Sequence, residues 1–129
     1  MQKKIQISRK IEGKETEFEV SIPLLVFMED KVHIVYAPAL DLSGYGESAK
    51  EAMTSFELVL EEFFDYTSSH KTLLTELERL GWKHVGSDQP NLTPPTITEM
   101  AKLNEDFDSI FEVRHPTVAY RNVRIPSYV

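Results

Sequence analysis

The stretch that decides the fold is GESAKEAMTSFELVLEEFFDYT, residues 46–67. Ser48 is followed three residues later by Glu51, and this capping-box pattern predicts that a helix begins there. Apolar residues then recur every three or four positions, as one face of an amphipathic helix requires. They are Ala49, Ala52, Met53, Phe56, Val59, Leu60, Phe63 and Phe64. The sequence therefore predicts a long helix over residues 48–67 that packs through a wide apolar face.

Patterns typical of strands precede this helix. Alternating or continuous apolar runs predict strands at residues 5–11, 18–22, 24–28 and 32–37. Glu12-Gly13-Lys14 fits a turn between the first two, and Pro23 is expected to interrupt the ladder or to lie at an edge. The predicted fold class is α+β, with an antiparallel sheet from the first 46 residues, the long helix packed across it, and a C-terminal extension of helix and strands.

The chain after residue 67 predicts shorter elements. Leucines at spacings of three and four indicate a helix over residues 70–80, and Gly81 stands where its C-terminal cap belongs. Three prolines among small polar residues mark 86–95 as irregular. A second capping box, Thr96 with Glu99, opens a helix to about residue 107. Two short strands are expected after it, at residues 110–114 and 118–125.

These elements divide the chain into three parts. Residues 1–80 form an α+β domain, residues 81–95 a loop or linker, and residues 96–129 a C-terminal extension. The extension is expected to pack on the same domain or on a second subunit.

The amino-acid composition excludes some kinds of site and disfavours some kinds of partner. The chain has 129 residues, no cysteine and a formal net charge of -7, so disulfides and thiolate metal sites are excluded. The acidity disfavours nonspecific nucleic-acid binding and suits a basic partner, or serves only to keep the chain soluble. We expect no membrane span, no secretory signal and a cytoplasmic location.

A motif links the last predicted strand to the long helix. Its residues are Pro38, Leu40, Asp41, Gly46, Glu47, Ser48, Glu51 and Ala52. In this register, over residues 20–68, the chain resembles the HicB-like antitoxin family. The resemblance implies a reduced ribonuclease-H-like fold and, as partner, a small basic HicA-like toxin that cleaves messenger RNA.

The C-terminal third departs from that family. Many members carry a helix-turn-helix or ribbon-helix-helix that binds operator DNA, whereas here about sixteen residues with three prolines separate the two later helices. A solitary HicB-like regulator that binds nucleic acid therefore remains an alternative to a complete antitoxin.

Two sets of charged residues are candidates for binding. The exposed face of the long helix is expected to carry Glu57, Glu61, Glu62 and Asp65, which would meet a basic partner unless they are only a solvated face. Tyr120, Arg121 and Arg124 combine an aromatic ring with positive charge in the tail. We expect them to contribute to a homodimer in which strands 110–125 extend the sheet, and nucleic acid is the alternative.

The sequence favours a protein that is not an enzyme. A remnant metal-dependent nuclease would need convergent carboxylates, and only Asp30, Asp41 and Glu47 lie near the predicted sheet. Each has a structural explanation in a turn or beside a helix start. The histidines, at positions 33, 70, 84 and 115, show no metal-ligand spacing. No cofactor or metal is expected.

Overall fold

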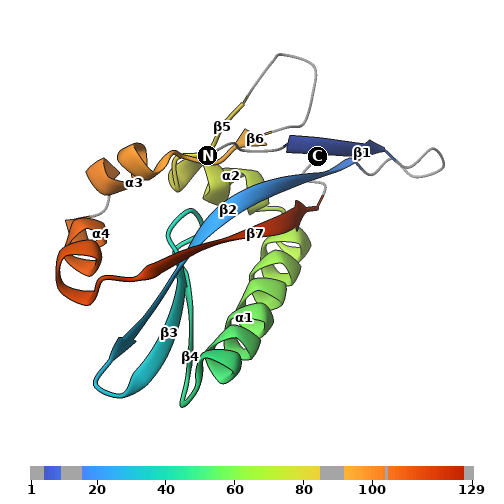
Figure 1. Ribbon diagram of the computed structural model, residues 1–129. Coiled ribbons are helices and arrows are strands. Elements are labelled where there is room, and N and C mark those ends of the chain that lie inside the picture. The colour runs from blue at the N-terminus through green and yellow to red at the C-terminus, as the bar shows by residue number, and fades with distance from the viewer. Residues whose placement is uncertain (1–4, 10–15, 85–91, 104, 127–129) are drawn as a thin grey trace.

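The computed structural model describes residues 5–9, 16–84, 92–103 and 105–126, and Figure 1 shows how its elements are arranged. One antiparallel sheet contains β1 (Ile5–Arg9), β2 (Thr16–Glu29), β3 (Val32–Ala37), β4 (Leu42–Gly46) and β7 (Thr117–Ile125). The helices are α1 (Ala49–Ser69), α2 (Leu73–Arg79), α3 (Ile97–Leu103), α4 (Glu105–Ser109) and the π-helical turn η1 (Ile110–Arg114). A separate ribbon joins β5 (Lys83–His84) to β6 (Leu92–Thr93). The predicted α+β class, with a long helix across the sheet, is confirmed.

Strand β2 lies at the centre of the sheet. Residues 18–26 pair with β7, residues 16–20 with β1 and residues 25–29 with β3. Because β7 overlaps both of the other partners, β1 and β3 must share the opposite edge of β2. Pro23 falls between those two partners, where no strand of the described residues pairs with that edge and a missing N–H is tolerated. The strand therefore continues through Pro23. The expectation of two separate strands there was wrong, and the alternative, a proline at an unpaired edge, agrees with the pairing.

The main core lies between the sheet and α1. Val20, Ile22 and Leu24 alternate along β2 and are buried on this side, where Phe56 and Leu60 of α1 belong to the same cluster. The predicted apolar face of the long helix is thus the face that packs, and α1 crosses diagonally from β4 toward the end of β7 (Figure 1).

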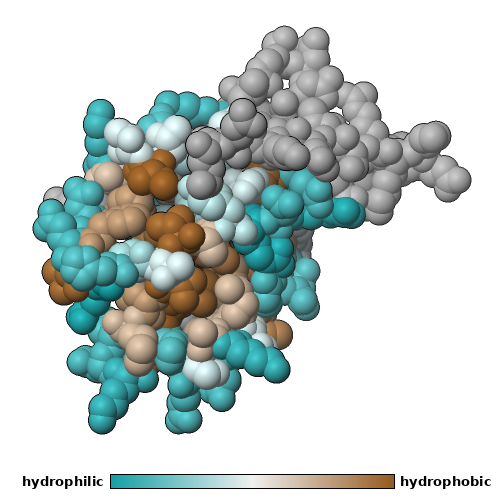
Figure 2. Space-filling model, viewed as in Figure 1, coloured by the Kyte–Doolittle hydropathy of each residue, from teal (hydrophilic) through white to brown (hydrophobic). Residues whose placement is uncertain are grey.

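A smaller core covers part of the opposite face of the sheet. Leu25, Ile34 and Tyr36 form one buried cluster with Phe107 of α4. Apolar residues also reach the surface near the junction of α3 and α4 with β2 and β7, where Figure 2 shows a hydrophobic area ringed by hydrophilic side chains. The face opposite α1 is therefore only partly covered.

The expected strand at residues 110–114 was wrong, because this segment is the π-helical turn η1. Ile110 and Phe111 pack against the smaller core, and helical geometry brings both to that core in one turn. His115 then takes a left-handed conformation, with φ of 47°, and ends the turn ahead of Pro116. A short apolar run of this kind does not distinguish helix from strand by its pattern alone.

The segment expected to be a loop or linker, 81–95, contributes to the main core. Gly81 has φ of 101° and ends α2, as its predicted capping role requires. Trp82 and Leu92 are buried, and the indole N–H of Trp82 donates to the carbonyl oxygen of Ala39 at 2.8 Å. The turn expected at 12–14 lies outside the described residues. In the part of the chain that the structure describes, no helix is long and apolar enough to span a membrane.

Candidate partner-binding surface

The four acidic residues predicted for the exposed face of the long helix differ in exposure and in ion pairing. Glu61, Glu62 and Asp65 are exposed, and within the described residues none of them forms an ion pair. Glu57 lies one turn earlier and is held by Arg121 of β7. We call Glu61, Glu62 and Asp65 the acidic stripe.

The Glu57–Arg121 pair has a two-pronged geometry. The Nε and Nη2 groups of Arg121 donate to the two carboxylate oxygens of Glu57 at 2.6 and 2.5 Å. These hydrogen bonds are the largest influence on both groups: they lower the pKa of Glu57 against the opposing effect of burial, and they raise the pKa of Arg121. The pair links β7 to α1. It also neutralises Glu57, which is why this residue is not counted in the acidic stripe.

Substituting Glu57→Gln and Arg121→Gln, alone and together, measures how much this pair stabilises the fold. We expect a coupling free energy of about 1 kcal/mol or less, because both side chains are partly exposed and water screens them. The pKa of Glu57 is lowered from 4.5 in the folded protein. Its stabilisation is therefore complete above that value and is lost as the pH falls through the lowered pKa. Urea unfolding of the four proteins from about pH 7 to about pH 2 checks this, and a coupling energy that stayed constant over the series would contradict it.

Two large side chains accompany the acidic stripe on the same exposed part of α1. Leu58 is 63% exposed and Tyr66 is 60% exposed. Leu58 stands three positions before Glu61, and Tyr66 stands four positions after Glu62, so each is a neighbour of a stripe carboxylate on the helix surface. Tyrosine is enriched among the residues that anchor protein interfaces and leucine is not, so Tyr66 is the better candidate for an anchor.

A groove runs between α1 and the outer edge of β7. It has a volume of about 370 Å³, and α1 lines it through Thr54, Glu57, Leu58, Leu60, Glu61 and Phe64. From β7 it is lined by Arg121, Val123 and Arg124. Side chains alternate between the faces of a strand, so Arg124 points to the face opposite Arg121 and Val123. A groove that touches all three therefore follows the edge of β7, and we call it the edge groove.

Residues of the motif that resembles the HicB-like family shape the turn and the helix start. Pro38 and Leu40 are buried in the β3–β4 turn. In the same turn Asp41 has φ of 54° and accepts a hydrogen bond from the hydroxyl of Tyr36 at 2.9 Å. These three residues hold the turn that leads into β4.

The capping box of α1 forms as the sequence predicts, with one difference. The Ser48 hydroxyl oxygen accepts from the Glu51 N–H at 3.1 Å, and the Glu51 carboxylate accepts from the N–H of Glu47 at 3.1 Å. The returning bond thus reaches one residue before the cap. Gly46 and Ala52 meet at the same place, because a Cβ on Gly46 would lie 2.5 Å from the backbone nitrogen of Ala52.

Sequence reasoning missed Gly44, which brings β4 closest to α1. A Cβ at this position would lie 2.2 Å from the backbone nitrogen of Phe56. Gly44 and Gly46 are two apart and so share one face of β4, which was the available signal. The two glycines fix the distance between the sheet and the helix that carries the acidic stripe.

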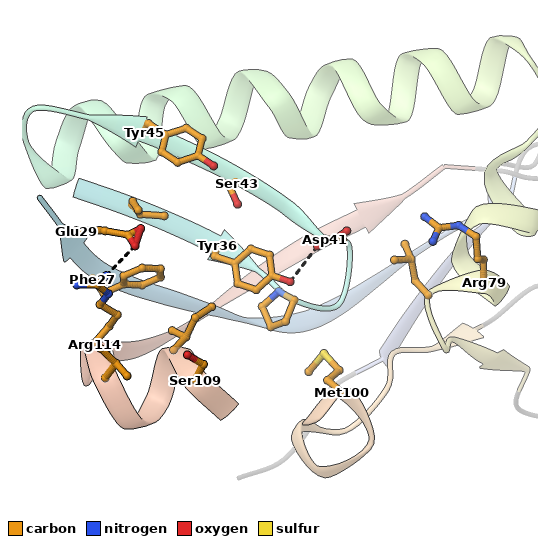
Figure 3. Close-up of a pocket in the computed structure, with 15 residues that line it drawn as sticks. Phe27, Glu29, Tyr36, Asp41, Ser43, Tyr45, Arg79, Met100, Ser109 and Arg114 are labelled. Atoms are coloured by element: carbon orange, nitrogen blue, oxygen red, sulfur yellow. Dashed lines mark hydrogen bonds and ion pairs between the residues drawn. The ribbon is translucent and has the colours of Figure 1, made fainter. Parts of the chain in front are cut away.

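A second groove of about 680 Å³ lies on the opposite face of the sheet. Figure 3 shows Tyr36, Ser43 and Tyr45 on its sheet side, with Ser109 and Arg114 on the facing wall. Its charged groups are already paired within the chain: Arg114 binds Glu29 at 2.8 Å, Asp41 accepts from Tyr36, and Arg79 binds Glu76 at 2.9 Å. The acidic stripe, by contrast, keeps its charge available.

The carboxylates considered for a nuclease site are not brought together. Asp30 lies in the β2–β3 turn and Asp41 in the β3–β4 turn, at opposite ends of the six-residue strand β3. Glu47 follows Gly46, which pairs with His33 at the Asp30 end. Within the described residues, no group of three or more histidine or acidic side chains is placed to hold a metal ion.

The tail residues predicted to bind a second subunit or nucleic acid are divided between the two faces of β7. Arg121 faces α1, whereas Tyr120 and Arg124 face the other side, where Arg124 approaches Glu19 at 3.8 Å. Tyr120 is 39% exposed beside Pro23. The two arginines therefore form no single basic surface. Comparisons of the chain with family models, with curated proteins and with solved structures each find no match, so the functional assignment rests on the acidic stripe and the edge groove.

Proposed function

We propose that this protein is a non-catalytic, protein-binding module similar to a HicB antitoxin, which neutralises a small basic HicA-like toxin in the cytoplasm. The observation that carries the proposal is the acidic stripe, three neighbouring carboxylates without ion pairs among the described residues. On a chain with a net charge of -7, such a stripe attracts a basic protein over a distance and speeds its association. The motif in which the sequence resembles the family, within residues 38–52, forms the β3–β4 turn and the capped start of α1.

The homodimer that the sequence predicts, formed by extension of the sheet through β7, competes with a partner protein for the same edge, because one edge accepts one added strand. The observation that favours the homodimer is the position of β7, which pairs with β2 on one side and, among the described residues, with no strand on the other. A second copy of β7 would extend the sheet there. Sedimentation velocity over a concentration series measures this self-association.

The two alternatives that the sequence leaves open have less support. A nucleic-acid-binding regulator would need a basic surface, and Arg121 is bound to Glu57 while Arg124 lies on the other face near Glu19. A remnant nuclease would need convergent carboxylates, and Asp41 lies at the far end of β3 from Asp30.

A pull-down with the purified protein from the cytosol of its own source, analysed by mass spectrometry, tests the proposal. We expect a small basic protein in stoichiometric amount, and the recovered protein should inhibit translation until this chain is added back. Recovery of this chain alone, at low salt and with no basic protein, would contradict the antitoxin proposal.

A further inference from the structure

The outer edge of β7 offers backbone groups for pairing, although the carbonyl oxygen of Asn122 in this strand already accepts a hydrogen bond from Nη1 of Arg121. The strand has nine residues, Thr117–Ile125, and its inner edge is fully paired with residues 18–26 of β2. No strand pairs with the outer edge in the part of the chain that the structure describes. No proline interrupts residues 117–125, so every N–H that points outward can donate to an added strand.

The edge groove supplies places for the side chains of such a strand. On the α1 side of the edge, Leu58, Leu60, Phe64 and Val123 give it an apolar lining. A strand added to β7 would place every second side chain over this lining, because side chains alternate between the two faces. Leu58, 63% exposed, would lose most of its contact with water under an added strand, which favours binding.

The charged residues near the edge groove favour an incoming strand that is basic. Glu61 belongs both to the edge groove and to the acidic stripe, so one unpaired carboxylate lines the path of an added strand, and the two other carboxylates of the stripe lie on α1 outside the groove. The arginines of β7 do not offset them, since Arg121 binds Glu57 and Arg124 approaches Glu19. Lysine or arginine at the positions that face α1 would lay its aliphatic stem over the apolar lining and bring its charge to Glu61.

The same charges act against a second copy at this edge. Two β7 strands paired antiparallel about a two-fold axis would place both α1 helices on one face of the joined sheet. The acidic stripes would then face each other across the axis, and like charges repel. A basic strand from another protein meets no such repulsion.

We infer that the outer edge of β7, together with the edge groove and the acidic stripe, binds an extended basic segment of the partner protein by adding it as a further strand. The inference rests on the proposed function and deepens it, because it states how the basic partner is held.

The probe is a synthetic peptide in which lysine alternates with valine and threonine. We expect it to bind in a one-to-one ratio by isothermal titration calorimetry, and more weakly as salt is raised. The control peptide has the same side chains, but the backbone amides along the edge that would pair with β7 are N-methylated. It keeps its charge and cannot donate backbone hydrogen bonds to β7. It should bind about tenfold more weakly or worse. Amide exchange should slow at alternate residues of β7 only with the unmodified peptide.

Three results would overturn the inference. They are equal binding of the two peptides, slowed exchange away from β7, and exchange at β7 that is already slow without peptide in a protein that sediments as a dimer. The outcome is independent of the pull-down. A basic partner recovered by a protein that ignores the peptide leaves the proposed function standing and the strand-addition mode wrong. If the peptide binds as expected but no basic partner is recovered, the strand-addition mode stands and the proposed function is wrong.

Discussion

Substituting Gly44→Ala is expected to destabilise the protein by about 3 kcal/mol or more. The added Cβ would lie 2.2 Å from the backbone nitrogen of Phe56 and 2.5 Å from the carbonyl oxygen of Ala52. Backbone atoms inside a helix cannot rotate away as a flexible side chain can, so α1 must move off the sheet. That movement would loosen the packing of Phe56, which is fully buried in the main core, and lost packing adds to the cost.

Urea unfolding followed by circular dichroism measures this loss, and the neighbouring residue provides the control. Ser43 precedes Gly44 in β4 and faces the groove on the other side of the sheet. Ser43→Ala should therefore change the free energy of unfolding by no more than about 0.5 kcal/mol. A second outcome is that Gly44→Ala prevents folding altogether. In that case Ser43→Ala is recovered as soluble protein and Gly44→Ala is not, which supports the prediction more strongly. Equal unfolding midpoints for the two variants would show that α1 does not approach β4 this closely.

Features set by neighbouring residues were predicted well from the sequence. Both capping boxes form: Ser48 caps α1, and at the start of α3 Thr96 and Glu99 exchange bonds of 2.8 and 3.1 Å. Each is decided within four residues of chain, by a side chain that satisfies a free N–H at a helix start. The same local logic identified the buried face of α1 from its spacing.

Features set by distant residues were not predictable in this way. Glu57 and Arg121 are 64 positions apart, and each was interpreted separately, one as a free acid for a partner and the other as a contact to a second subunit or nucleic acid. Only the pairing of β7 with β2 brings them together. Gly44 and Gly46 are two positions apart, a spacing that the sequence shows. The role of Gly44 depends on the distance between β4 and α1, which the spacing of residues within a strand does not specify.

The strand assignments show the same division. Alternation identified β2 on both sides of Pro23, yet continuity through the proline depends on β1 and β3 leaving that stretch of the edge unpaired. For residues 110–114 the apolar pattern was compatible with either structure. Packing against Leu25 and Phe107 decided for a helical turn.

Reversing two charges of the acidic stripe, Glu61→Lys with Asp65→Lys, is expected to slow association with the basic partner by on the order of tenfold to a hundredfold at low salt. Both side chains are exposed and without ion pairs in the described structure, so the substitutions replace attraction by repulsion and break no pair within the fold. Glu57 is left unchanged because its loss would also release Arg121. Surface plasmon resonance over a salt series, with the partner recovered by pull-down or the lysine peptide immobilised, measures the rates.

The control for this reversal has the same spacing and the same change in net charge. Asp108 and Glu112 are four positions apart, as Glu61 and Asp65 are, and both are exposed on the α4–η1 segment, outside the edge groove. If the stripe acts as a local docking surface, Asp108→Lys with Glu112→Lys should slow association by less than about threefold, because screening over roughly 10 Å limits the reach of a distant charge. The stripe variant should also lose much of the salt dependence that the control keeps. Equal slowing by the two variants would mean that the partner responds to the net charge of the chain, and α1 would then have no special part in binding.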